Sequence, residues 1–142
     1  MLTIVIDTNI IVSSLISSGF PSRIVNDYVV EEKVTLLLSQ SVLDEYVEVL
    51  NREKFKKYPI FKRNADLILT KLPEISIFYE PDIELNVISD KTDNKFLELA
   101  VYGQAEYLIT GNTNDFTIEE YENVKILSPR KFLEIIEKQI LT

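Results

Sequence analysis

The sequence contains no cysteine and no histidine, and these two absences exclude several kinds of chemistry. Without cysteine there are no disulfides, thiolate zinc sites or cysteine nucleophiles. Without histidine there is no imidazole metal ligand, no Ser-His-Asp triad and no use of the commonest general base. Any chemistry must therefore come from carboxylates, amides, hydroxyls, lysine or arginine. The chain also starts without a basic segment, and its first apolar run is too short for a signal peptide or a membrane span, which favours a cytoplasmic protein.

The composition is that of an ordinary folded protein. With 142 residues, of which 46% are hydrophobic and 27% charged, we expect a single domain over residues 1–142 with one buried core. The net charge of −8 argues against a protein that coats nucleic-acid phosphates. One segment departs from this balance: Arg52–Arg63 (REKFKKYPIFKR) holds six basic residues and one acidic, a local charge of +5 that leaves −13 for the rest of the chain. The segment is either a contact for RNA or a solvated charged linker with Phe55 and Phe61 packed inward.

Short apolar, β-branched segments alternate with amphipathic ones along the chain. The apolar segments are typical of buried parallel strands, and several amphipathic ones begin at serine or proline, as helices do. The alternation predicts an α/β fold, a three-layer sandwich with a central parallel sheet of about five strands. The expected strands are Leu2–Ile6, Val34–Leu38, Ile75–Tyr79, Glu106–Thr110 and Val124–Leu127. The expected helices are Asn9–Ile16, Pro21–Val30, one from Ser39 or Ser41, Pro59–Leu72, Asp93–Gly103 and one from Ser128.

Acidic and amide side chains lie where the expected strands end. Asp7 follows the first strand directly, and Asn112 and Asp115 lie in the loop GNTNDF after the strand that ends at Thr110. Asp93 begins the helix DNKFLELAVYG, at the head of its apolar face. Since the carboxyl ends of parallel strands and the amino ends of the following helices share one edge, we expect these residues to come together there.

The helix that contains VLDEYVEVLN offers three further acids, and a helical wheel separates them. Asp44 and Glu48 point away from the apolar stripe, whereas Glu45 lies at its border and is the candidate for the shared edge. In the later helix, the wheel places Lys95 and Glu98 toward water.

Each of these side chains also has an ordinary structural interpretation. A single aspartate is most often a helix cap, Glu45 alone would be a solvated helix residue, and Asn112 and Asp115 alone would be turn formers. Together they are harder to explain, because two like charges 4 Å apart cost about 4 kcal/mol at an effective dielectric constant of 20. A cation removes that cost, and oxygen donors without nitrogen or sulfur favour Mg²⁺ or Mn²⁺. Such ions bind phosphates and activate water.

The motifs that carry these residues resemble those of the PIN-domain family, in particular its VapC-like toxins. They are VIDTNIIVSSL, LSQSVLDEYVEVL, SDKTDNKFLELA and YLITGNTNDF followed by VKILSPRKFL, and they span nearly the whole chain. The resemblance implies a metal site of four acids, which correspond here to Asp7, Glu45, Asp93 and a residue of the GNTND loop. The chain departs from the family pattern at Asn112, where many relatives have aspartate, so the fourth ligand is either Asn112 or Asp115.

The resemblance implies a Mg²⁺- or Mn²⁺-dependent endoribonuclease, the toxin of a type II toxin–antitoxin pair. The implied catalytic residues are Asp7, Glu45, Asp93 and Asp115, the metal ligands Asp7, Asp93, Asn112 and Asp115, and the supporting residues Thr8, Asn9, Asp90 and Thr110. The basic segment supplies the candidate RNA contacts Arg52, Lys54, Lys56, Lys57, Lys62 and Arg63. Glu45 would position or deprotonate the attacking water, and Thr110 would help to position the loop that follows it. The expected partners are RNA, a small antitoxin protein and a second copy of the chain, without a membrane.

Two other functions fit the sequence. A receiver-like signalling domain also places an acid after an early strand of a parallel sheet and binds Mg²⁺, but it predicts two adjacent acids near the start and a lysine after the last long strand. Here Asp7 stands alone, and no lysine follows Thr110 before Lys125. The other alternative is a catalytically weak or inactive PIN-like module that binds RNA or protein, which the departure at Asn112 keeps open.

Overall fold

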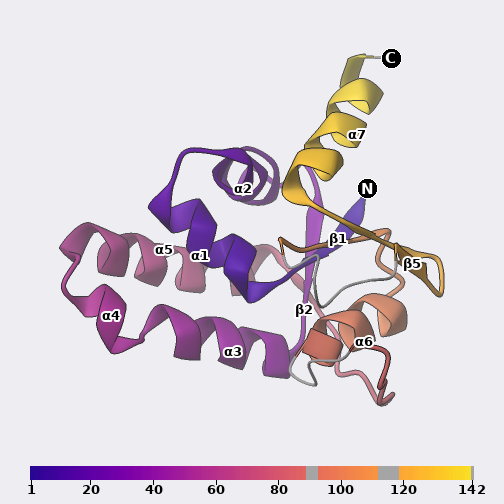
Figure 1. Ribbon diagram of the computed structural model, residues 1–142, viewed down its shortest axis with the longest axis horizontal. Coiled ribbons are helices and arrows are strands. Elements are labelled where there is room, and N and C mark those ends of the chain that lie inside the picture. The colour runs from indigo at the N-terminus through magenta and orange to yellow at the C-terminus, as the bar shows by residue number, and fades with distance from the viewer. Residues whose placement is uncertain (89–92, 112–118, 142) are drawn as a thin grey trace.

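In the part of the chain that the computed structural model describes, residues 1–88, 93–111 and 119–141, six strands form one sheet flanked by helices (Figure 1). The strands are β1 (Thr3–Ile6), β2 (Thr35–Leu38), β3 (Ile77–Phe78), β4 (Tyr107–Ile109), β5 (Glu120–Tyr121) and β6 (Val124–Leu127). The helices are α1 (Thr8–Ile16), α2 (Phe20–Arg23), the π-helix η1 (Ile24–Val29), α3 (Gln40–Leu50), α4 (Glu53–Lys56), α5 (Pro59–Ile75), α6 (Asn94–Tyr102) and α7 (Pro129–Leu141). Within these described residues, no helix is both long and apolar enough to span a membrane.

The order of the strands fixes where a ligand can bind. The order is β3-β2-β1-β4-β6-β5, and every neighbouring pair is parallel except β5 and β6. From β1 the sheet grows toward β2 in one direction and toward β4 in the other, so the strand order reverses between β1 and β4. In parallel α/β sheets the crevice for a ligand opens at the carboxyl ends of the strands at such a point. Here the residues that follow these two strands are Asp7 and Thr110.

The sequences of the central strands are continuous apolar runs, because helices cover the sheet and bury the side chains of these strands. Ile4, Val5 and Ile6 of β1 are fully buried, as are most residues of β2 and β4. Helices α1, α3 and α5 pack against one another and form the group on the left of Figure 1 with α4, while α6 packs against β1, β2 and β4. The predicted α/β fold, a sheet between helices, is confirmed.

Several elements differ from the sequence prediction. The strand expected over Ile75–Tyr79 is only β3, because α5 continues past its expected end at Leu72 and takes up Ile75, and the basic segment contains the unexpected helix α4. The segment Pro21–Val30, expected as one helix, is the short α2 followed by η1. The sheet contains a sixth strand, β5, which forms a hairpin with β6 and makes that edge antiparallel. Glu122 and Asn123 join the two strands with positive φ angles of 49° and 69°, the backbone of a tight two-residue hairpin turn.

Candidate active site

Asp7 is the buried residue at which β1 ends and α1 begins. Its Oδ1 accepts a hydrogen bond from the backbone N–H of Ile10 at 3.1 Å, which makes it the N-cap of α1. Its Oδ2 accepts one from the hydroxyl of Thr110, the residue after β4. Burial raises the pKa of Asp7 to about 6, and the charge of Glu45 adds to the rise, although the hydrogen bonds from Thr110 and Ile10 oppose it. Burial therefore makes the charged form of Asp7 less favourable than that of an exposed carboxylate, and a cation beside it would stabilise that form.

Helix α3 is fixed against β1 by the side chain next to Glu45. Tyr46 is fully buried, and its hydroxyl donates a hydrogen bond to the carbonyl oxygen of Ile6, the last residue of β1. Burial, with the negative charges of Asp7 and Glu45, raises the pKa of Tyr46 well above its ordinary value, so it stays a donor. At the start of the helix, Ser39 caps α3 by accepting a hydrogen bond from the N–H of Val42 at 3.1 Å. These contacts set the rotation of α3 and aim Glu45 at the edge where Asp7 lies.

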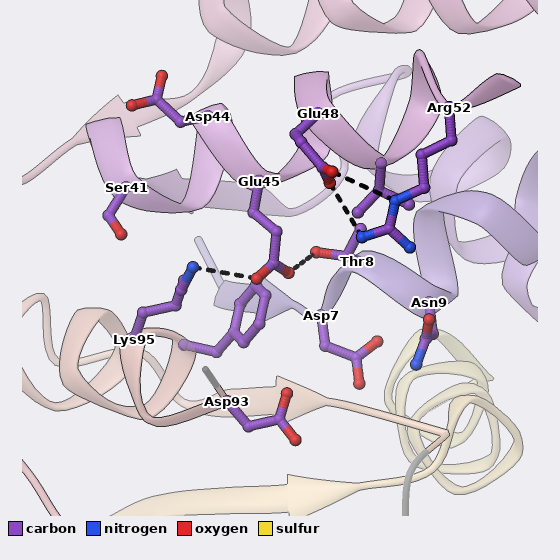
Figure 2. A pocket seen from close by; sticks show the side chains of 12 residues that line it. Asp7, Thr8, Asn9, Ser41, Asp44, Glu45, Glu48, Arg52, Asp93 and Lys95 are labelled. Atoms are coloured by element: carbon purple, nitrogen blue, oxygen red, sulfur yellow. Dashed lines mark hydrogen bonds and ion pairs between the residues drawn. The ribbon is translucent and has the colours of Figure 1, made fainter. Parts of the chain in front are cut away.

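The carboxylate of Glu45 is engaged at both oxygens (Figure 2). The hydroxyl of Thr8, the first residue of α1, donates a hydrogen bond to Oε2. The ammonium of Lys95, on α6, forms an ion pair with Oε1 at 3.0 Å. The side chain of Glu45 is only 20% exposed, so these contacts are partly shielded from water. Helices α1, α3 and α6 are thus joined through one carboxylate.

Asp93 lies just before α6 and faces the same space as Asp7 in Figure 2. It occupies the N-cap position, yet its side chain makes no capping hydrogen bond to α6, and its Oδ2 is shielded from solvent. The next residue, Asn94, is buried and accepts hydrogen bonds from the N–H groups of Val87 and Ile88 at 3.2 and 2.9 Å. Asn94 therefore ties the preceding segment to α6 and fixes where Asp93 begins the helix. The capping interpretation explains Asp7 in part, but it does not explain Asp93.

These residues line a pocket of about 910 Å³ between α1, α3 and α6. The described acidic residues in its lining are Asp7, Asp44, Glu45, Glu48 and Asp93, the basic ones Arg52 and Lys95, and the neutral polar ones Thr8, Asn9 and Ser41. Five acids against two cations give this lining a formal charge of −3. Such a pocket attracts cations, and it admits a phosphate only where a positive charge meets it.

A family model described as "PIN domain" matches residues 3–114, which cover β1 through β4 and the acids that line the pocket. The chain belongs to the PIN-domain family. An uncharacterized protein of Methanocaldococcus jannaschii is 32% identical over 146 aligned positions, which cover 96% of this chain and 93% of that protein. The resemblance inferred from the motifs is thereby confirmed at the level of the family.

Solved structures that include the following three share the fold of this chain. FitAB bound to the IR36 DNA fragment superposes with a TM-score of 0.57 at 16% identity, over 89% of this chain and 94% of that chain. VapBC2 of Rickettsia felis, bound to a DNA fragment from its promoter, gives 0.58 at 16% identity, over 89% and 98% of the two chains. FitAcB of Neisseria gonorrhoeae gives 0.54 at 19% identity over the same shares. The receiver-like alternative does not fit this sheet, because β4 lies beside β1, whereas a receiver-like order of 2-1-3-4-5 places the third strand there.

The structure brings three of the predicted acids of the PIN domain into one pocket: Asp7, Glu45 and Asp93. Thr8 and Asn9 line it too. Thr110 contacts Asp7 directly, which the sequence did not predict. Three other predicted site residues, Asp90, Asn112 and Asp115, lie outside the described residues, so their roles stay predictions.

The prediction that Lys95 and Glu98 face water is wrong. The side chain of Lys95 is 26% exposed and pairs with Glu45. Glu98 accepts a hydrogen bond from the backbone N–H of Leu85 at 2.9 Å. A helical wheel describes one helix in isolation, whereas α3 and the segment before α6 close over these two side chains. The signal in the sequence was a lysine two residues after Asp93. It could be interpreted only once the contact between α3 and α6 was known, because that contact brings Lys95 to Glu45.

Asp44 and Glu48 are exposed, as predicted, but both line the outer wall of the pocket. Asp44 accepts a hydrogen bond from the side chain of Gln40 at 2.7 Å, and Figure 2 shows it turned away from Asp7. Glu48 forms an ion pair with Arg52 at 3.0 Å. Glu48 therefore contacts a cation of the pocket, whereas Asp44 contacts a residue of its own helix.

The basic segment Arg52–Arg63 is not a linker, because it forms α4 and the first turn of α5. Phe55 and Phe61 pack inward, as predicted, with their rings stacked 4.3 Å apart. Arg52 lines the pocket, while Lys54, Lys56, Lys57 and Arg63 are exposed on α4, α5 and their junction. The segment thus has an apolar inner side and a basic outer side. Its predicted contact with RNA stays a prediction, and the exposed basic side chains are the ones that would make it.

The donor chemistry of the pocket fits a hard divalent cation. The described acids offer only carboxylate oxygens, and the raised pKa of Asp7 means that a nearby cation would be favoured by restoring the charged form. Within residues 1–88, 93–111 and 119–141, no three acidic side chains converge closely enough to hold a metal ion. Asp7 and Asp93, whose carboxylates face the same space in Figure 2, are the described residues that would hold Mg²⁺ or Mn²⁺, and Glu45 is engaged by Lys95 and Thr8.

Proposed function

We propose that this PIN domain is a Mg²⁺- or Mn²⁺-dependent endoribonuclease and the toxin of a toxin–antitoxin pair. PIN domains are generally nucleases. The observation that carries the proposal is the placement of two carboxylates, Asp7 and Asp93, beside one pocket at the point where the strand order reverses. Burial raises the pKa of Asp7, and a bound cation would stabilise its charged form.

In this proposal each residue has a separate task. Asp7 and Asp93 hold the cation, with Asn112 or Asp115 as a further donor. The chemistry that Mg²⁺ or Mn²⁺ supplies when bound is orientation of a phosphate, activation of water and stabilisation of the leaving oxygen. Glu45 orients or deprotonates the attacking water, and Thr110 keeps the Asp7 carboxylate aimed into the pocket. In-line attack leaves a 5′-phosphate and a 3′-hydroxyl.

The direct test is cleavage of transfer, ribosomal and messenger RNAs with Mg²⁺, with Mn²⁺ and with EDTA. We expect cleavage that needs the metal and that is abolished in Asp7→Asn and in Asp93→Asn. Both variants should fold, because each removes one charge from an acidic pocket. Asp27→Asn, which changes an exposed aspartate on η1 outside the pocket, is the matched control and should cleave at the wild-type rate. Variants that melt well below the wild type without metal would identify Asp7 and Asp93 as structural residues.

The toxin part of the proposal is supported by the resemblance to VapC-like toxins and by the fold shared with VapBC and FitAB. We expect overexpression to arrest growth, and co-expression of a small adjacent gene, the antitoxin, to relieve the arrest. The Asp7→Asn chain should not be toxic. Toxicity that persists in Asp7→Asn would mean that the protein acts by sequestering RNA or another partner.

A catalytically inactive interaction module is the second candidate function. It is favoured by the lack of three converging acids among the described residues and by asparagine at position 112. Such a module would bind RNA in EDTA as tightly as with Mn²⁺ and would cleave none of the RNAs. Metal-dependent cleavage therefore separates the two candidates directly.

A further inference from the structure

Lys95 is the cation that reaches deepest into the acidic pocket. It is the second residue of α6, two positions after Asp93, and its side chain is 26% exposed, against 50% for Arg52 at the rim. Its ammonium lies 3.0 Å from Oε1 of Glu45, on the wall that Asp93 shares (Figure 2). Long lysine side chains normally extend into water, so a lysine drawn into a pocket of net negative charge needs an explanation.

The contacts around Lys95 hold it in a defined place. Glu45 fixes the ammonium through Oε1, and Thr8 fixes Glu45 in turn through Oε2. An ammonium has three N–H donors, so Lys95 can remain bonded to Glu45 and still donate to a second oxygen. Glu48 binds the guanidinium of Arg52 through two nitrogens at 3.3 and 3.0 Å, which also leaves N–H donors for a second acceptor. Lys95 differs in being more shielded from water, so an ion pair that it forms with an incoming anion is screened less.

An RNA phosphate that approaches Asp7 and Asp93 enters a field of negative charge. With a formal charge of −3 on the described lining, the phosphate is repelled unless a fixed positive charge contacts it. A metal ion would reduce part of this repulsion, and a protein cation in the same pocket would reduce it further. Ion pairs between an ammonium and a phosphate are also stronger in a partly shielded pocket than at an open surface.

We propose that Lys95 is a phosphate-binding residue of the pocket, positioned by Glu45 and Thr8. The phosphate is that of single-stranded RNA, and in this respect the inference rests on the proposed function. Lys95 donates to a non-bridging oxygen of an RNA phosphate that enters the pocket beside Glu45. Glu45 consequently has a positioning role toward Lys95 in addition to its proposed role toward water.

The test measures binding of a short fluorescein-labelled single-stranded RNA of mixed sequence by anisotropy, in EDTA and in an Asp7→Asn background, so that cleavage does not interfere. Lys95→Met and Lys95→Gln should each weaken binding about tenfold. Each should also lower the slope of log K against log salt by about 0.7, the value for one lost phosphate contact on a single strand. Lys95→Arg should retain most of the binding. Lys131→Met, an exposed lysine on α7 outside the pocket, removes the same charge and should bind as the parent does.

A double variant separates contact with the phosphate from simple neutralisation of Glu45. If Lys95 only cancels the charge of Glu45, adding Glu45→Gln to Lys95→Met restores binding, and that result overturns the proposal. If Lys95 contacts the phosphate, the double variant stays weak. A parent chain that binds no RNA, or a Lys95→Met chain with parental affinity and salt slope, also overturns it. Failure of the proposed function looks different, because the wild type then cleaves no RNA with Mn²⁺ while Lys95→Met still weakens binding.

Discussion

At the scale of single residues, Asp7 shows how one carboxylate can cap a helix and still serve a site. Its Oδ1 is used by the N–H of Ile10, and its Oδ2 by the hydroxyl of Thr110. These bonds orient the group but do not offset its burial, since the pKa stays raised to about 6. Asp7 is therefore held in place at a cost that a bound cation would remove, which is the behaviour expected of a metal ligand.

The raised pKa of Asp7 predicts that the metal-free chain loses stability as the pH rises. The pKa is about 6 in the folded chain against an ordinary value of 3.8, so between these values the folded chain holds a proton that the unfolded chain has lost. The stabilising contribution is full below pH 3.8 and is lost as the pH rises through about 6. The change in the free energy of unfolding is about 3 kcal/mol. Urea unfolding in EDTA at about pH 4 and about pH 7 measures it.

The Asp7→Asn chain is the reference for this measurement, because asparagine is an equally good N-cap and carries no titrating proton. Subtracting its free energy of unfolding cancels the titration of the other carboxylates. The wild type should lose stability relative to Asp7→Asn between the two pH values, and the variant should be at least as stable near neutrality. A difference that does not change with pH would show that Asp7 titrates normally.

The sequence predicts the acids of the pocket better than it predicts their contacts. Asp7, Glu45 and Asp93 could be assigned to one edge because strand ends and helix starts share that edge in any parallel sheet. The ion pair between Glu45 and Lys95 could not, because it depends on how closely α3 and α6 approach. The direction of a side chain about its own helix axis does not reveal which neighbour covers it.

At the scale of helices and strands, α3 serves the core and the pocket with adjacent faces. Val42, Tyr46 and Leu50 recur at a spacing of four residues and are buried. Glu45 and Glu48 lie on the face beside this stripe and line the pocket. The position of the core stripe therefore determines which acids reach the site, so a change in the rotation of α3 would affect both stability and function.

Gly103, which ends α6, is a position where the packing leaves no room for a side chain. A Cβ at Gly103 would lie 2.7 Å from Cδ1 of Leu37 and 3.0 Å from Cδ2 of Tyr79. Leu37 is fully buried, so Gly103→Ala should destabilise the chain by about 1–3 kcal/mol in urea unfolding. Gly111→Ala is the matched control, because its Cβ would meet nothing closer than Cδ1 of Ile10 at 3.6 Å, an ordinary contact, and it should not destabilise the chain. Equal stability of the two variants would mean that Leu37 and Tyr79 move aside freely.

The longer helices and strands were predictable from the sequence, whereas η1, α4 and β5 were not. Serine and proline mark the starts of α3, α5 and α7, and apolar runs mark β1, β2 and β6. Strand β5 has only two residues and depends on a turn in which Glu122 adopts a positive φ of 49°. Glutamate seldom takes that conformation, so the turn has only Asn123 as a sequence signal.

At the scale of the whole molecule, positive charge is concentrated where RNA would arrive. The chain carries a net charge of −8, and the basic segment Arg52–Arg63 follows α3 directly, beside the pocket. Arg52 joins the two, since it is the first residue of the segment and lines the pocket. An RNA strand that binds near Arg52 would run from the acidic pocket along the basic outer side of α4 and α5. Its binding should then depend on salt through few contacts.

The last prediction tests whether α4 contacts that strand. Lys56 forms an exposed ion pair with Glu53, and Lys57 lies over the ring of Tyr58 at 5.4 Å. Both interactions are weak at an exposed surface, so the chain should fold without these two lysines. Changing both to glutamine should weaken RNA binding and lower the slope of log K against log salt by about 0.7 for each lost phosphate contact. The rate of cleavage at saturating RNA should change little, because uniform binding energy affects KM before kcat. An unchanged salt slope together with full activity would restrict RNA recognition to the pocket, where Lys95 and Arg52 supply the positive charge, or to a second copy of the chain.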